Sequence, residues 1–142
     1  MTRKPSPMSD LLHHRGRSLS KGQPVSLPIM ASTTFHLPGD PDGSHFYGRN
    51  GNPTVECVEA EIGLLEAAET VLFPSGMAAI AAVFHTLLRP GDKVLVHADG
   101  YYNVRSLLEE HFVPRGIEVE TCPTAGMDQA DMSGCRLVMI ET

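Results

Sequence analysis

The chain has 142 residues, of which 42% are hydrophobic and 20% charged, and its formal net charge is −6 at pH 7. This composition is ordinary for a globular protein, and the negative charge excludes a general attraction to nucleic acid or to anionic membranes. The sequence has no apolar run near the ~20 residues that span a bilayer, and no apolar segment of a signal peptide. We therefore expect a cytoplasmic protein that binds neither nucleic acid nor membrane.

The cysteines and histidines do not form a metal-binding pattern. The three cysteines, Cys57, Cys122 and Cys135, are widely spaced and include no CxxC pair. The adjacent His13 and His14 have no histidine partner four residues away, as a helical metal site would need. We expect reduced thiols and no bound metal.

The first 46 residues are dominated by turn-forming residues. The segment 38–43 reads Pro-Gly-Asp-Pro-Asp-Gly, and further prolines upstream exclude a long helix. We expect residues 1–46 to form an extended arm that makes contacts between subunits. Residues 47–142 are then expected to be the first part of an α/β domain.

Two helices with a short apolar segment between them are predicted next. Asn52 can cap a helix with Pro53 at its first position, and apolar residues then recur at helical spacing. The apolar triplet 71–73 predicts a strand. After Ser75-Gly76, helical spacing predicts a second helix over 76–88, with apolar residues Met77, Ile80, Ala81, Phe84, Leu87 and Leu88.

The remaining elements alternate between strand and helix. A turn at 89–92 precedes a short strand over 93–96, and a third helix, marked by Val104, Leu107, Leu108 and Phe112, ends at Pro114 and Gly116. Strands are predicted over 117–120 and 137–140. Apolar strands alternating with helices predict an α/β fold with a mostly parallel sheet flanked by helices. Because the last strand lacks a covering helix, we expect the chain to be a truncated N-terminal fragment.

The turn through Ser75-Gly76 is a candidate phosphate site. The first N–H groups of a helix have no partner in the helix, and they point with the positive end of the helix dipole toward whatever lies above them. Tyr47 and Arg49 supply a phenol and a guanidinium that can hold a phosphate. No Gly-x-Gly-x-x-Gly or Walker motif is present, so a phosphorylated cofactor is favoured over a nucleotide.

The sequence resembles the Cys/Met-metabolism family of pyridoxal-phosphate enzymes, which includes the cystathionine lyases and synthases. The resemblance depends on Tyr-Gly-Arg-Asn-Gly-Asn-Pro-Thr at 47–54 together with Ser-Gly-Met-Ala-Ala at 75–79. It continues through Pro-Gly-Asp at 90–92, Tyr101, Arg105 and the closing Ile-Glu-Thr at 140–142. It implies pyridoxal 5'-phosphate as the cofactor and the large domain of aspartate-aminotransferase-like enzymes as the fold.

The resemblance also implies roles for single residues. Gly76 and Met77 would donate N–H groups to the cofactor phosphate, and Ser75 would shape the turn. Tyr101 would stack on the pyridine ring, with Tyr102 as the alternative. In the resembled family the phosphate is also reached from a neighbouring subunit, so the resemblance implies active sites shared across a dimer interface, with Tyr47 and Arg49 as the residues for this contact. It also implies a homotetramer, because the family usually assembles as a dimer of such dimers.

The chain departs from the family pattern near the expected substrate pocket. Tyr102, Asn103 and Val104 stand where the family commonly has Gly, a small residue and Thr. Asn103 counts against a methionine γ-lyase, because those enzymes typically have Cys there. Gly48 replaces a Ser of the family, a change that we expect to be mild.

The three lysines, Lys4, Lys21 and Lys93, do not suit a Schiff base with the cofactor. None has the apolar surroundings that would lower the pKa of an amine. In the resembled family the lysine lies beyond the position of Thr142, so we expect no catalytic residue in these 142 residues and no activity from them alone.

The resulting hypothesis is a transsulfuration enzyme that eliminates or replaces a sulfur-linked group of an amino acid. Cystathionine γ-lyase is the first choice, and cystathionine γ-synthase or β-lyase are the alternatives. Two hypotheses of other classes are a non-catalytic pseudoenzyme fragment that pairs with a homologue, and a binding domain for another phosphate ligand.

Overall fold

The computed structural model describes residues 6–12, 19–26, 29–40 and 42–141. The chain forms two compact units, Met1–Leu72 and Phe73–Thr142, which are described separately. His13 and His14 lie outside the described residues. The boundary between these two units falls after residue 72. The boundary predicted at residue 46 is of another kind, because it sets off an arm that is expected to make contacts between subunits. The boundary at residue 46 stays a prediction.

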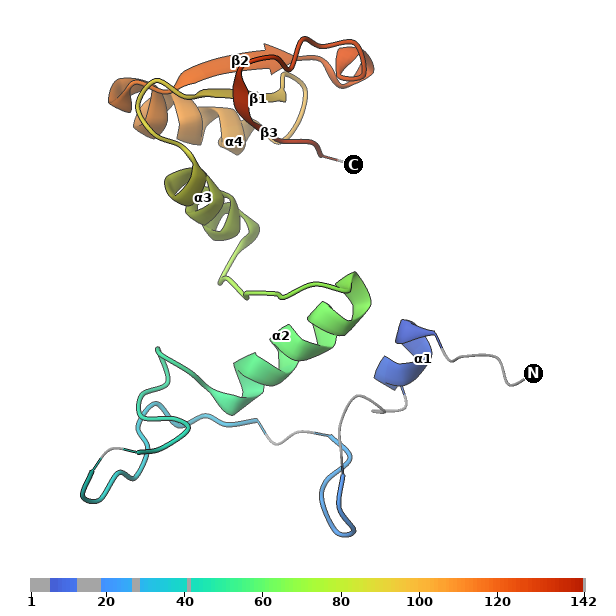
Figure 1. The fold of residues 1–142 in the computed structure, drawn as a ribbon, viewed down its shortest axis with the longest axis vertical. Coiled ribbons are helices and arrows are strands. Elements are labelled where there is room, and N and C mark those ends of the chain that lie inside the picture. Colours follow the sequence, from blue (N-terminus) through green and yellow to red (C-terminus); the bar gives the residue numbers. More distant parts are fainter. Residues whose placement is uncertain (1–5, 13–18, 27–28, 41, 142) are drawn as a thin grey trace. The chain divides into compact units, whose positions relative to one another are not determined.

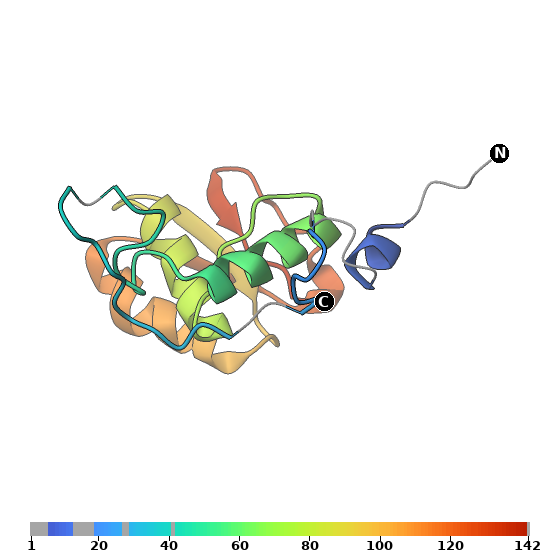
Figure 2. The ribbon, with the colours of Figure 1, turned by 90° about the horizontal axis from the view of Figure 1, so that it is seen from below.

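The first unit contains two helices, α1 (Pro7–Leu12) and α2 (Pro53–Glu66), joined by turns and irregular chain (Figure 1). The predicted cap of α2 is confirmed, because Asn52 has extended backbone angles and its side chain accepts a hydrogen bond from the Thr54 N–H. Figure 2 shows α2 as one uninterrupted helix. It ends at Ala67, which adopts the left-handed conformation with φ of 52°.

The arm has little regular structure, as its prolines predict. Among its described residues, α1 is a helix of only six residues. An isolated antiparallel bridge joins Thr34 to Tyr47, and the Gly48 N–H donates to the Thr33 carbonyl at 2.8 Å. A Cβ atom at Gly48 would lie 3.2 Å from the Thr33 Cα. A serine here would therefore have to displace the adjoining arm slightly.

The second unit alternates helices with three strands (Figure 1). The helix before the sheet is α3 (Gly76–Leu87), and α4 (Tyr102–Leu107) continues into a π-helical turn and a 3-10 turn before Gly116 ends the run with φ of 85°. The strands are β1 (Lys93–His97), β2 (Glu118–Cys122) and β3 (Cys135–Val138), and a 3-10 turn, Thr124–Gly126, follows β2.

The three strands form a parallel sheet in the order β2-β1-β3. The central strand places Val94 beside Val119 of β2 and Leu137 of β3. In the hydrophobic core, α3 and the helical run that begins with α4 pack against this sheet. The buried residues of the core are Phe84, Leu88, Val94, Val96, Val104, Leu108, Phe112 and Ile117. The predicted α/β fold, a parallel sheet flanked by helices, is confirmed.

The predicted strand over Val71–Phe73 is wrong. These residues belong to no strand and their side chains are exposed. An extended segment becomes a strand only when a neighbouring strand pairs with it, and among the described residues none does so here. The Leu72 N–H instead donates to the Glu59 carboxylate at 2.7 Å.

The other predicted elements differ from the structure mainly at their ends. The strand predicted over 117–120 lies at 118–122, and the one over 137–140 lies at 135–138. The predicted third helix changes to π-helical geometry at Leu108, which its apolar spacing does not reveal. Pro114 lies in the closing 3-10 turn.

Candidate functional site

The N-terminus of α3 has two main-chain donors without a partner in the described part of the chain. Ser75 caps the helix from an extended conformation: its Oγ accepts the Ala78 N–H at 3.1 Å, and its carbonyl accepts the Ala79 N–H at 3.1 Å. The N–H groups of Gly76 and Met77 have no hydrogen-bond partner among the described residues. This arrangement suits an anion, which the helix dipole also attracts.

The space above this helix end is open within the described chain. Ser75 and Gly76 are exposed, and a Cβ atom added to Gly76 would meet no atom within 4 Å. Gly76 also does not have the positive φ that would demand glycine. Neither backbone conformation nor packing within the described chain therefore requires glycine at this position. A ligand that approaches the backbone closely would require it.

Tyr101 lies in the loop between β1 and α4, with its ring half exposed. Its N–H donates to Glu141 Oε2 at 2.7 Å, and its hydroxyl accepts from the Asn103 amide at 2.6 Å. The rings of Tyr101 and Tyr102 meet edge to face, with centroids 5.4 Å apart. Tyr101 is thus held at both its main chain and its hydroxyl, and Tyr102, 63% exposed, has no polar side-chain contact among the described residues.

Hydrogen bonds to both sides of the loop from His97 to Tyr101 fix its course. Arg105 donates to the carbonyl oxygens of His97, at 3.2 Å, and Gly100, at 3.0 Å. Thr124, in the turn that follows β2, donates its hydroxyl at 2.8 Å and its N–H at 2.9 Å to Asp99 Oδ1. Arg105 of α4, which the sequence indicated only through the family resemblance, therefore helps to fix the position of this loop.

In the first unit, Tyr47 and Arg49 lie together. The Arg49 guanidinium lies over the Tyr47 ring, 5.1 Å from its centroid, a cation–π contact. The turn that carries them is closed by the N–H groups of Asn50 and Gly51, which donate to the Tyr47 carbonyl at 2.8 and 3.2 Å. Both side chains are exposed.

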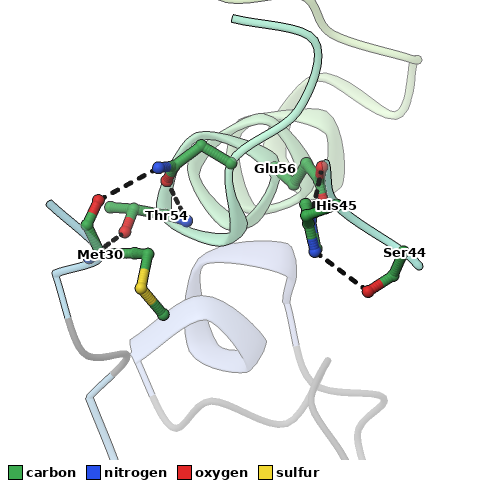
Figure 3. A network of polar contacts seen from close by, with 6 residues as sticks. Met30, Ser44, His45, Thr54 and Glu56 are labelled. Carbon is green, nitrogen blue, oxygen red and sulfur yellow. Dashed lines mark hydrogen bonds and ion pairs between the residues drawn. The ribbon is translucent and has the colours of Figure 1, made fainter. Parts of the chain in front are cut away.

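The arm is attached to the start of α2 by a network of side-chain contacts (Figure 3). The Met30 N–H donates to the Thr54 Oγ1 at 2.8 Å, and the Asn52 amide donates to the Met30 carbonyl at 3.1 Å. On the other side of the helix, His45 Nε2 lies 3.0 Å from the carboxylate oxygens of Glu56. Asn52 therefore caps α2 and holds the arm at once, a second role that sequence reasoning missed.

The structure places Ser75, Gly76 and Met77 in one helical turn, as predicted, and Tyr101 in the same unit. Tyr47 and Arg49 lie in the other unit. Lys93 pairs with Glu120, whose hydrogen bond raises the Lys93 pKa. A raised pKa is the opposite of what a reactive amine needs.

Comparison with known proteins decides the family. Residues 9–142 match the family model described as "Cys/Met metabolism PLP-dependent enzyme". The chain belongs to this family. A putative cystathionine γ-lyase of Streptomyces coelicolor is 46% identical over 124 residues, 81% of this chain and 30% of the relative. A cystathionine γ-synthase of Mycobacterium tuberculosis is 33% identical, over 83% of this chain and 32% of the relative.

Solved structures agree in fold. The crystal structure of metB from Corynebacterium glutamicum matches with a TM-score of 0.80 and 28% identity, over 96% of this chain and 38% of that chain. The cystathionine γ-lyase from Lactobacillus plantarum complexed with L-serine matches with a TM-score of 0.67 and 31% identity, over 80% of this chain and 30% of that chain. This family member thus spans about a third of the length of these relatives.

The described residues contain neither a metal-binding cluster nor a membrane-crossing helix. No group of three or more His, Cys, Asp or Glu residues in this part of the chain could hold a metal ion. No described helix combines the length and apolarity that a membrane crossing requires.

We predict that Asn52→Asp separates the two roles of this residue. Aspartate still accepts the Thr54 N–H and caps α2, but it cannot donate to the Met30 carbonyl. Hydrogen exchange at the Met30 amide should quicken while helix α2 stays protected. Asn52→Ala loses both roles and should destabilise this unit by about 1 kcal/mol. Equal exchange at Met30 in the Asp variant and the unmutated protein would contradict the second role.

We also predict a pH dependence from Asp99. The Thr124 hydroxyl, followed by the Thr124 N–H, lowers the pKa of Asp99 below its ordinary value of 3.8. The bonds therefore stabilise the fold above the unfolded-state pKa, and this contribution is lost as the pH falls through the lower folded-state pKa. Urea unfolding between about pH 6 and about pH 3 should show a weaker pH dependence for Asp99→Asn. An unchanged dependence would show that Asp99 does not contribute.

Proposed function

We propose that the protein is a pyridoxal-phosphate-dependent enzyme that eliminates or replaces a sulfur-linked group of an amino acid, with cystathionine γ-lyase as its activity. The observation that carries this proposal is the α3 N-terminus, where the N–H groups of Gly76 and Met77 have no partner among the described residues and the space above Gly76 is open. Membership of the family supports pyridoxal 5'-phosphate as the ligand.

The residues present fit the phosphate of this cofactor. Gly76 and Met77 would donate their N–H groups to its oxygens. The Ser75 Oγ accepts the Ala78 N–H, so its own hydroxyl hydrogen remains available to a phosphate oxygen. When bound, the cofactor supplies an electron sink that stabilises negative charge at the α-carbon of an amino acid.

Tyr101 is the proposed partner of the cofactor ring. Its ring is half exposed, and the hydrogen bonds from Asn103 to its hydroxyl and from its N–H to Glu141 limit its movement. A preorganised ring can stack on a planar ligand at low entropic cost. Tyr102 lacks such support among the described residues, which favours Tyr101 for this role.

Tyr47 and Arg49 are proposed to bind the phosphate held by a neighbouring subunit. The guanidinium already lies against the phenol ring and both groups are exposed, so they can approach one phosphate together. The active sites would be shared within a dimer, and two dimers would form a homotetramer. The reactive lysine would come from outside these residues, since Lys93 is paired with Glu120.

The alternative activities are cystathionine γ-synthase and β-lyase, and relatives of both names are similar to this chain. Product analysis separates the two elimination reactions. With L-cystathionine, the gene product should release cysteine by γ-elimination, whereas β-elimination releases homocysteine. Failure to consume cystathionine would overturn the proposed activity.

We predict that Gly76→Asp weakens pyridoxal-phosphate binding at least about tenfold relative to Gly76→Asn. The two side chains have nearly the same size, but the aspartate carboxylate repels the phosphate. Aspartate is favourable at a helix N-terminus, so the Asp variant should fold. Equilibrium dialysis of the cofactor-free protein measures the two affinities. Equal affinities would show that the phosphate binds elsewhere.

A further inference from the structure

His97, the last residue of β1, is a buried polar residue. Its side chain is 5% exposed, and its Nδ1 lies 2.9 Å from the Thr124 Oγ1. Its Nε2 is buried and has no hydrogen-bond partner among the described residues. Buried polar atoms of this kind are normally satisfied by protein or by ordered water.

The contacts of Thr124 determine which ring nitrogen carries the hydrogen. Hydrogen bonds lower the pKa of Asp99, so its carboxylate is an acceptor only. The Thr124 hydroxyl gives its single hydrogen to Asp99 Oδ1 at 2.8 Å. Its oxygen must therefore accept from the His97 Nδ1–H. In the neutral ring, Nε2 then has a lone pair and needs a donor.

A small cavity adjoins this histidine. Its volume is about 10 Å³, close to the space that one water molecule needs. Three polar residues, His97, Tyr101 and Glu141, contribute to its lining. The wall is otherwise apolar, with Val96, Val104 and Met139.

Gly100 makes this arrangement possible. A Cβ atom at Gly100 would lie 2.5 Å from Glu141 Oε2 and 3.0 Å from the His97 Cβ. A larger residue here would therefore push the Glu141 carboxylate away from its present position. Glycine lets Glu141 reach the Tyr101 N–H, to which its Oε2 is bonded at 2.7 Å.

We propose that this cavity binds one water molecule, which donates one hydrogen to His97 Nε2 and the other to the Glu141 carboxylate, and that His97 and Glu141 are positioning residues for Tyr101. A continuous chain of hydrogen bonds then runs from Asp99 through Thr124, His97 and the water to Glu141 and the Tyr101 N–H. The benefit to the cofactor rests on the proposed function, since it assumes that Tyr101 stacks on the cofactor ring.

The unmutated protein, as its gene encodes it, provides the first test. Nitrogen-15 spectra of the histidine rings should show a neutral His97 with hydrogen on Nδ1 and a hydrogen-bonded, unprotonated Nε2, with magnetisation transfer from water to the ring. A hydrogen on Nε2, or no transfer from water, would overturn the water site.

Two substitutions of His97 test the positioning role. His97→Asn retains a donor near Nδ1 but lacks the Nε2 acceptor, whereas His97→Gln places an amide oxygen near Nε2. Hydrogen exchange at the Tyr101 amide should quicken about fivefold in the Asn variant and return toward the unmutated rate in the Gln variant. An unchanged rate in the Asn variant, or the same increase in both variants, would overturn the role.

Ligand binding separates this inference from the proposed function. His97→Asn should weaken pyridoxal-phosphate binding about fivefold and leave the binding of inorganic phosphate unchanged, because only the cofactor has a ring for Tyr101. If the unmutated protein bound no cofactor, the proposed function would fail, and the exchange rates would still decide the hydrogen-bond chain. Equal loss of cofactor and phosphate binding would contradict positioning through Tyr101.

Discussion

The burial of the central strand β1 is the interaction on which the second unit depends. Val94, Leu95 and Val96 are at most 1% exposed, and both edges of the strand are paired in parallel. Parallel neighbours cannot be joined by a tight hairpin, and the chain here crosses from β1 to β2 through α4 and the helical turns that follow it. This constraint brings the loop after β1 to the carboxyl edge of the sheet, where ligands of such folds commonly bind.

Two regions of this unit use polar groups in opposite ways. At the start of α3, Ser75 satisfies the N–H groups of Ala78 and Ala79, and those of Gly76 and Met77 have no partner among the described residues. In the loop after β1, Arg105, Asp99 and Glu141 instead satisfy main-chain groups within the protein. The first region keeps main-chain donors exposed, and the second provides the rigidity that keeps a side chain in one orientation.

The first unit is held together by different means. Helix α2 has no buried residue, and side-chain to main-chain hydrogen bonds, chiefly from Asn52 and Thr54, attach the arm to it. Its exposed apolar residues Val55, Val58 and Leu65 follow the predicted helical stripe. Specific polar contacts therefore hold the local geometry of this unit, a role that a hydrophobic core normally fills.

The sequence by itself determined the features that depend on neighbouring residues. The Asn52 cap, the helix after Ser75-Gly76 and the apolar strand β1 follow from local capping rules and periodicity, and the family follows from two motifs. Only the tertiary structure decided that 71–73 forms no strand, that Asn52 also binds Met30, and that Glu141 holds Tyr101. The Asn52 and Glu141 contacts join residues about twenty to forty positions apart, and whether 71–73 forms a strand depends on a partner strand elsewhere, so no local pattern contains their energies.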